Sequence, residues 1–504
     1  MKHDYTTILQ MEEFAAAGEH LGVLLNELIS ERMMSAEHGA VEEELRISGA
    51  ELLRRFLQGY LDKRAKDEPN LDEVEATDGP IRTQRRAGCQ RTLMTIFGEV
   101  TVTRIRYGKP GTESLVPLDA QLNLPNDKYS DGLRKLVAEE ASLKSFDEVV
   151  LSIKNLTAGE VPKQQAEQLV VAVSRDFENF YTSDRQTSPG LTSDPLVLTL
   201  DGKGIVMIPD SLREATKKAA ENEKHKMQTR LSKGEKRGRK RMATVAAVYD
   251  VEKFVRHPNE IMMRSSEKDE ASRPHARNKR VWASVEREAL AVTEEVFEEA
   301  LRRDPQQKRP WAILVDGQSH QLHNISVCIE KFKIKRPEII LDLVHVLEYL
   351  WKAAFVLHAE GSEDAEEWVR ERALSILSGG AANVAAGIRR SATMRKVPKA
   401  DRGPMDTCAD YLLKYASMMQ YHKFLDRGLP IATGIIEGAC RHLIKDRMDV
   451  TGARWSVAGA EAILKVRSLR SSGDFEDYLH YHKGQELQRN HLARYATSPL
   501  RSAA

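Results

Sequence analysis

Two aspartates follow runs of residues that have the pattern of buried strands. Residues 196–200 precede Asp201, residues 312–315 precede Asp316, and each aspartate is followed by glycine. In α/β sheets, ligands are held beyond the carboxyl ends of the strands, and a glycine there leaves room for a substrate backbone. Two carboxylates at neighbouring strand ends repel each other unless a divalent cation lies between them, so the pattern predicts a metal site. For either Asp-Gly pair taken alone, the alternative is a tight turn that closes a strand.

A third carboxylate comes from a segment with a helical pattern. Glu437 lies in the largely apolar residues 433–445, and Arg441 and Lys445 follow it at four-residue spacing. Helical spacing would stack the three on one face, with a metal at one end and phosphates along the rest. The alternative for Glu437 and Arg441 is a surface ion pair. Because no set of Cys or His ligands lies nearby in the sequence, oxygen ligation favours Mg²⁺ or Mn²⁺.

Three further residues are candidates for supporting roles. Asp342 and His345 lie one helical turn apart after the apolar residues 339–341, where they could support the metal site or hold a phosphate. The alternative is a helix N-cap beside a satisfied histidine. Trp455, beside Arg454, could stack on an extruded base, although a lone Trp in a helical segment is more often part of a core.

Five segments, taken in order, carry a family resemblance: residues 201–204, 315–318, 342–345, 433–441 and 449–455. They resemble the DDE transposases of Kra-type bacterial insertion sequences, which are related to the Mutator-like group, and the resemblance spans roughly residues 90–475. It implies an RNase H-like catalytic domain in which Asp201, Asp316 and Glu437 bind two Mg²⁺ or Mn²⁺ ions. Asp342 and His345 would then be supporting residues.

The elements that must position these residues divide into an N-terminal and a central part. Residues 1–80 have a helical pattern with an apolar stripe, which favours packing within their own domain or dimerisation. The members of the stripe are Leu45, Leu52, Leu53, Phe56, Leu57, Tyr60 and Leu61. Residues 81–185 combine a basic β-hairpin with a helix-turn-helix pattern. In that pattern Ser145 and Glu148 form a capping box, and a second helix begins near Pro162.

The central and C-terminal parts are expected to form an α/β fold. Residues 190–350 alternate strands and helices, with a basic insertion over residues 211–241. An all-α insertion over residues 351–430 precedes residues 431–475, which hold the glutamate helix and the end of the core. Residues 476–504 are expected to be a C-terminal helix and tail.

Basic side chains are expected to contact DNA, some by reading a groove and some by phosphate contact. The candidates are Arg85, Arg86, Arg104, Arg106, Lys163, Gln164, Lys236, Arg237, Arg239, Lys240, Arg441, Lys445, Arg454 and Trp455. The formal net charge of the 504 residues is only +1, so any nucleic-acid surface must be local.

Composition narrows the class of protein further. The sequence has no apolar run of 18 residues and no apolar signal region at its N-terminus. Neither a membrane span nor secretion is therefore expected. The 4 cysteines are widely spaced, which is typical of a reducing cytoplasm. The resemblance to bacterial transposases implies that the protein acts at the nucleoid. The absence of a phosphate-binding Gly-rich loop motif disfavours an ATP-driven enzyme.

These observations together predict a transposase. It would bind double-stranded DNA at the terminal inverted repeats of an element and at the target, acting as a homo-oligomer of at least two copies. It would catalyse metal-dependent strand cleavage and strand transfer. Two alternatives remain: a domesticated DNA-binding protein of transposase origin, and a structure-selective nuclease of RNase H-like fold.

Overall fold

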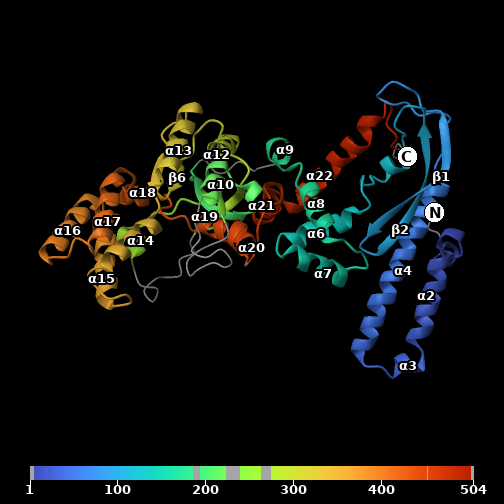
Figure 1. Ribbon diagram of the computed structural model, residues 1–504, viewed down its shortest axis with the longest axis horizontal. Coiled ribbons are helices and arrows are strands. Elements are labelled where there is room, and N and C mark those ends of the chain that lie inside the picture. Colours follow the sequence, from blue (N-terminus) through green and yellow to red (C-terminus); the bar gives the residue numbers. More distant parts are fainter. Residues whose placement is uncertain (1–4, 186–192, 223–238, 263–273, 451, 501–504) are drawn as a thin grey trace. The chain divides into compact units, whose positions relative to one another are not determined.

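The computed structural model describes residues 5–185, 193–222, 239–262, 274–450 and 452–500. The chain divides into two compact units (Figure 1). The first, called here the terminal unit, comprises Met1–Arg185 and Phe475–Ala504. The second, the central unit, comprises Gln186–Asp474. The central unit is therefore inserted, along the chain, between the two segments of the terminal unit.

The terminal unit begins with a helical hairpin. Its elements are α1 (Tyr5–Leu9), η1 (Glu12–Phe14), α2 (Ala15–Leu28), α3 (Glu31–Met34) and α4 (His38–Lys66). Figure 1 shows α2 and α4 side by side, with α3 at their far end. In the predicted apolar stripe, Leu57 and Leu61 pack against the β-hairpin, whereas Leu45 and Leu53 are exposed. Packing within the domain is thus confirmed for part of the stripe only.

A long β-hairpin follows, formed by β1 (Gln84–Thr95) and β2 (Gly98–Gly108). The predicted hairpin is confirmed, and its strands are longer than predicted. Leu93, Val100 and Val102 form one core cluster with Leu61 and Leu124. Further along, the register shifts between Arg86 and Cys89. Near this bulge, Ile105 and Tyr107 of β2 belong to a second core cluster, with Val74, Leu115 and Tyr495 among its members.

Short helices complete the chain as far as the central unit: α5 (Pro117–Gln121), α6 (Asp131–Ala141), α7 (Phe146–Leu156), α8 (Lys163–Val173), α9 (Phe177–Asn179) and the π-helix η2 (Phe180–Asp184). The predicted helix pair is confirmed as α7 and α8. Ser145 caps α7 through a capping box with Glu148, and Pro162 is the N-cap of α8. Helix α6 packs against both, as a third helix.

The C-terminal segment folds with the N-terminal one. Helix α22 (Phe475–Asn490) and η7 (Leu492–Arg494) belong to the terminal unit, where Tyr495 joins the core cluster of Ile105 and Tyr107. The three regions expected over residues 1–80, 81–185 and 476–504 thus belong to one compact unit. Contacts between residues more than 300 positions apart leave no local pattern in the sequence.

The central unit is a mixed α/β structure built on one five-stranded sheet. Its strands are β3 (Leu196–Met207), β4 (Arg239–Asp250), β5 (Arg277–Ser284), β6 (Trp311–Val315) and β7 (Glu338–Leu341), in the order β5-β4-β3-β6-β7. Strands β3, β4 and β5 pair antiparallel, and β6 and β7 are added in parallel. Strand β5 was not predicted, because Arg280 makes its start polar. Arg280 is buried, and its charge is neutralised by ion pairs with Glu295 and Glu299.

Helices cover the sheet and extend the unit. Those before the predicted insertion are η3 (Pro209–Ser211), α10 (Glu214–Glu221), α11 (Pro258–Ile261), α12 (Ala289–Arg303), α13 (Ser319–Lys331) and α14 (Leu343–Ala354). The all-α insertion is confirmed as α15 (Glu363–Leu377), α16 (Ala381–Met394), α17 (Gly403–Lys414), η5 (Ala416–Met418) and α18 (Tyr421–Asp426). The chain then forms α19 (Gly434–Ala439), the π-helix η6 (Cys440–Lys445), α20 (Asp446–Met448) and α21 (Val457–Ser472).

Two further expectations concern the basic insertion over residues 211–241 and membrane-spanning helices. The predicted basic insertion over residues 211–241 is partly wrong, because residues 239–241 begin β4 and pair with β3. Residues 223–238 lie outside the described part of the chain. Among the helices of the described part, none is both long enough and apolar enough to cross a membrane.

Candidate active site

Three aspartates lie in one row across neighbouring strands. In the parallel pairing of β3 with β6, Thr199 is opposite Leu314. Continuing that register by two residues brings Asp201 beside Asp316, and the pairing of Val315 with Leu341 likewise brings Asp342 to its other side. Residues at one level of a parallel sheet point to the same face. The register therefore brings together three acids that are far apart in the sequence.

Asp201 lies inside a strand, where the sequence predicted a strand end. Strand β3 continues to Met207 because its second half pairs with β4 alone, past the point where β6 stops. The Asp201 carboxylate accepts hydrogen bonds from the backbone N–H of Gly202, at 2.6 Å, and from the thiol of Cys440, at 3.0 Å. Cys440 is buried, and burial together with the Asp201 charge raises the pKa of its thiol. Cys440 lies within the segment 433–441, but nothing in the sequence indicates its bond to Asp201.

Asp316 follows the last residue of β6 and begins a tight loop. Its Oδ1 accepts a hydrogen bond of 2.9 Å from the backbone N–H of Gln318. Gly317 has φ of 90°, a conformation that favours glycine. A Cβ at Gly317 would also lie 3.1 Å from a ring atom of Tyr415. The predicted glycine after the acid therefore serves a positive φ and a close approach of an aromatic ring.

Asp342 is buried, and both of its carboxylate oxygens accept hydrogen bonds from other groups of the protein. Oδ1 accepts from the backbone N–H of Val344, at 3.0 Å, which makes Asp342 the N-cap of α14. Oδ2 lies 3.1 Å from Nδ1 of His345 and accepts a hydrogen bond from the Thr433 hydroxyl. The hydrogen bond to Asp342 raises the pKa of His345, against the opposing effect of burial. Asp342 thus links its own helix to the start of the helix that carries Glu437.

Glu437 is exposed on α19, close to the other acids. Partial burial raises the pKa of its carboxyl, and the charges of Asp342, Glu348 and Asp201 raise it further, with His345 acting in the opposite direction. Glu348, which lies three residues after His345 on α14, was missed by sequence reasoning. The spacing from His345 was the only available signal.

The expected alignment of Glu437 with Arg441 and Lys445 on one α-helical face was wrong. Residues 440–445 form the π-helix η6, whose wider turn changes the spacing. Arg441 lies 3.7 Å from Asp446 in an exposed ion pair, and Lys445 is exposed. Neither cation was found to pair with Glu437 among the described residues.

The donor set fits a divalent ion in chemistry and charge. Asp201, Asp316 and Glu437 offer carboxylate oxygens, which Mg²⁺ and Mn²⁺ prefer. Partial burial raises the pKa of Glu437, and the charge of Asp201 adds to that rise. The oxygens of the three acids do not all lie within 4.8 Å of one another, so a shared ion would require side-chain rotation.

In the described part of the chain, the group that meets this spacing is in the terminal unit: Asp176, His482 and Glu486. There, Arg489 binds Asp176 through two hydrogen bonds of 3.0 and 2.9 Å and also pairs with Glu486. Since a cation already neutralises these acids, the group is an ion-pair network that holds α22 in place.

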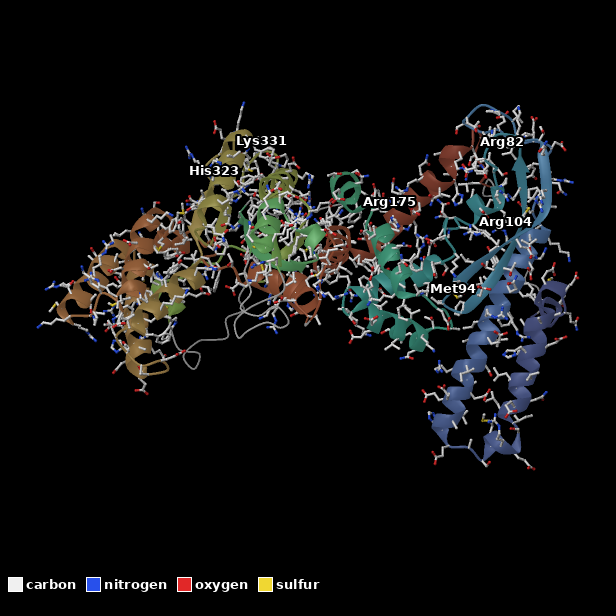
Figure 2. All side chains as sticks on the ribbon, viewed as in Figure 1. Arg82, Met94, Arg104, Arg175, His323 and Lys331 are labelled. Atoms are coloured by element: carbon white, nitrogen blue, oxygen red, sulfur yellow. The ribbon has the colours of Figure 1, made fainter. Side chains whose placement is uncertain are left out.

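The basic hairpin divides into internal and exposed arginines. Arg85, Arg86 and Arg106 are exposed, and Arg86 lies directly opposite Arg106 in the register. Arg104, labelled in Figure 2, is instead bound 2.8 Å from Asp119 and is only 12% exposed. Its prediction as a DNA contact is therefore wrong for this conformation, because the side chain neutralises the buried Asp119.

The other predicted DNA contacts differ in exposure, and some of them lie outside the described residues. Lys163 and Gln164 are exposed in the first turn of α8, and Lys163 pairs with Asp147 at 2.8 Å. Lys236 and Arg237 lie outside the described residues. Arg239 and Lys240 are on β4, where Lys240 lies 3.8 Å from Asp449.

Trp455 cannot serve as a stacking platform in this structure. Only 7% of the residue is exposed, its indole N–H donates to the Met448 carbonyl, and the Arg447 guanidinium covers the ring at 4.7 Å. Arg454, next to it, is exposed. The prediction of base stacking by Trp455 is corrected to a core role, and buried Trp282 is a core residue as well.

No protein-family model matches the chain, and no curated protein sequence matches it. The geometry alone defines the candidate site: an acidic cluster at the edge of a mixed sheet, formed by strands and helices far apart in the sequence.

Proposed function

We propose that this protein is a DNA transposase of an insertion sequence and that its central unit is an RNase H-like catalytic domain. The observation that carries the proposal is the row formed by Asp201 within β3, Asp316 directly after β6 and Asp342 directly after β7, close to Glu437. The mixed sheet, with three antiparallel strands followed by two parallel ones, supports the proposed fold. The ordered motifs that resemble Kra-type transposases support it independently.

Asp201, Asp316 and Glu437 would hold two Mg²⁺ or Mn²⁺ ions. Such ions supply activation of an oxygen nucleophile and charge stabilisation for in-line displacement at phosphorus. Asp342 orients His345 and accepts a hydrogen bond from Thr433, the residue just before the Glu437 helix. Because its pKa is raised, His345 holds a proton more readily and can donate to a phosphate oxygen.

DNA would be held by both units. In the terminal unit, the exposed Arg85, Arg86 and Arg106 would contact phosphates, while Lys163 and Gln164 at the start of α8 would face a groove. Such a protein would act in the bacterial nucleoid, on the inverted repeats of its element and on target DNA. The exposed apolar side chains of the α2–α4 hairpin, Leu45 and Leu53 among them, favour self-association.

The test is cleavage and joining of labelled duplexes by the purified protein with Mg²⁺. Asp201→Asn and Asp316→Asn should each abolish cleavage and leave binding of terminal DNA within a few-fold, because each change removes a metal ligand and leaves the proposed basic DNA contacts of the terminal unit unaltered. A wild-type protein that binds DNA but never cuts it would favour the domesticated DNA-binding protein. Cleavage of branched DNA without strand transfer would favour the nuclease.

A further inference from the structure

The helical insertion contacts the backbone on both sides of Gly317. Tyr411, on α17, donates a hydrogen bond of 2.9 Å from its hydroxyl to the carbonyl of Asp316. Tyr415, which follows α17, donates to the carbonyl of Gly317. Strand β6 has ended at Val315, whose carbonyl accepts the last sheet bond, from the N–H of Asp342 at 2.8 Å. The two tyrosines thus bind carbonyls that lie beyond the end of β6.

The bond from Tyr415 reaches the Asp316 carboxylate through one rigid group. The Gly317 carbonyl and the Gln318 N–H belong to the same peptide unit, which is planar. That N–H donates to Oδ1 of Asp316 at 2.9 Å. Fixing the carbonyl end of the plane therefore fixes the direction of the N–H that holds the carboxylate.

Packing of the rings restricts the loop further. Atoms of the Tyr415 and Tyr411 rings lie 3.1 and 3.3 Å from where a Cβ of residue 317 would be. Tyr411 also stacks on Tyr349 of α14, with ring centroids 4.0 Å apart. Tyr415 is buried, so water does not compete for its hydroxyl bond. The insertion thereby connects the Asp316 loop to the helix that Asp342 caps.

We propose that the helical insertion positions the Asp316 carboxylate, with Tyr415 as the principal positioning residue and Tyr411 as the second. This inference rests on the proposed function, because it assigns the insertion a part in building the metal site. Tyr415 touches neither metal nor substrate. It acts through the 317–318 peptide, so its loss should loosen the direction of one ligand and leave the acid in place.

The test compares Tyr415→Phe with the wild-type full-length protein. This change removes the hydroxyl and keeps the ring. We expect the Mg²⁺ concentration for half-maximal cleavage to rise about three- to tenfold, the range for loss of one hydrogen bond. Cleavage should recover at high Mg²⁺, and DNA affinity should not change. Mn²⁺ binding without DNA, measured by electron paramagnetic resonance, should weaken by a similar factor.

Tyr478→Phe is the matched control. Tyr478 is also buried and also donates to a backbone carbonyl, that of Val173, but it lies in the terminal unit. It should lower thermal stability without shifting the Mg²⁺ midpoint. If Tyr415→Phe left both metal readouts at wild-type values, or if cleavage fell equally at every Mg²⁺ concentration, the positioning role would be refuted. A wild-type protein that neither binds Mn²⁺ nor cleaves DNA would instead refute the proposed function.

Discussion

At the scale of single residues, the acids of the candidate site differ in what surrounds them. Glu437 is exposed and accepts no bond from a described cation, whereas Asp342 is buried and accepts three hydrogen bonds, from Val344, His345 and Thr433. A carboxylate whose oxygens already accept three hydrogen bonds is suited to holding neighbouring residues in place. An exposed carboxylate with a raised pKa is suited to receiving a cation.

Glu437→Gln and Asp342→Asn should therefore fail in different ways. Glu437→Gln should abolish Mg²⁺-dependent cleavage with little change in stability, because the side chain is exposed. Asp342→Asn should retain some cleavage but cost about 1–3 kcal/mol of unfolding free energy, since a buried acceptor network is broken. Cleavage assays and urea unfolding of both variants check this. Full cleavage by Glu437→Gln would remove it from the ligand set.

The Asp176 network gives a pH dependence at the same scale. Burial alone would raise the pKa of Asp176, but hydrogen bonds from His482 and Arg489 outweigh it and lower the pKa to about 2. A lowered pKa stabilises the fold above the unfolded value, near 4, and the stabilisation is lost as pH falls toward 2. Asp176→Asn should cost roughly 2 kcal/mol at pH 7 and progressively less below pH 4. Unfolding of both proteins across pH 2–7 measures the difference; a constant difference would contradict the ion-pair account.

At the scale of elements, the β1–β2 hairpin separates arginines that hold the fold from arginines that face solvent. Arg104 neutralises Asp119, and Arg91 donates to the backbone carbonyls of Pro125 and Asp127. Arg86 and Arg106, by contrast, face each other on an exposed part of the ladder. Like charges placed opposite each other destabilise a hairpin, which favours a bound anion between them.

Replacing Arg86 and Arg106 together by Gln should weaken binding to terminal and random duplexes alike. The slope of log affinity against log salt concentration should flatten by about 0.9 for each phosphate that the protein no longer neutralises. Arg104→Gln is the control, because it should lower thermal stability and leave the salt slope unchanged. Equal slopes for the double variant and the wild type, from titrations at several salt concentrations, would move phosphate binding elsewhere.

Local signals in the sequence were sufficient for much of this architecture. The capping box at Ser145, the apolar run before Asp316 and the helical pattern over residues 351–430 depend on neighbouring residues, and the structure confirms these elements. Strand β5 was missed because its buried Arg280 is neutralised by glutamates on another element. The spacing on the Glu437 helix was misjudged because the π-helix has no signature in the sequence.

The site itself was predictable only in part. The Asp-Gly pattern indicated Asp201 and Asp316, and the helical pattern of residues 433–445 indicated Glu437 before the resemblance implied the same three residues. Thr433 and Cys440 were missed as partners because each acts on an acid that is distant in the sequence. The role of Arg104 depends in the same way on Asp119, which only the fold brings near.

At the scale of the whole molecule, the two ends of the chain share one unit. Asn126 and Asn490 are hydrogen-bonded at 2.9 Å, His491 contacts the Leu124 carbonyl, and Tyr495 completes a core cluster. The terminal unit therefore depends on residues that lie beyond the central unit in the sequence.

Deleting residues 475–504 should unfold or strongly destabilise the terminal unit while the central unit keeps its own transition. Calorimetry should show loss of one transition and retention of the other, and the deletion variant should lose DNA binding. Residues 1–185 joined by a flexible linker to residues 475–504 should restore it. Unimpaired DNA binding by the deletion variant would show that α22 is dispensable.

The shared unit also sets an order of events during synthesis. Domains on a ribosome generally fold as they emerge, N-terminal ones first. Here the first 185 residues must wait, with the core around Tyr107 open, until the last helix leaves the exit tunnel. The central unit can fold earlier, because all its strands have emerged by then. A polypeptide cut short by premature termination would thus carry a folded central unit without a completed terminal unit.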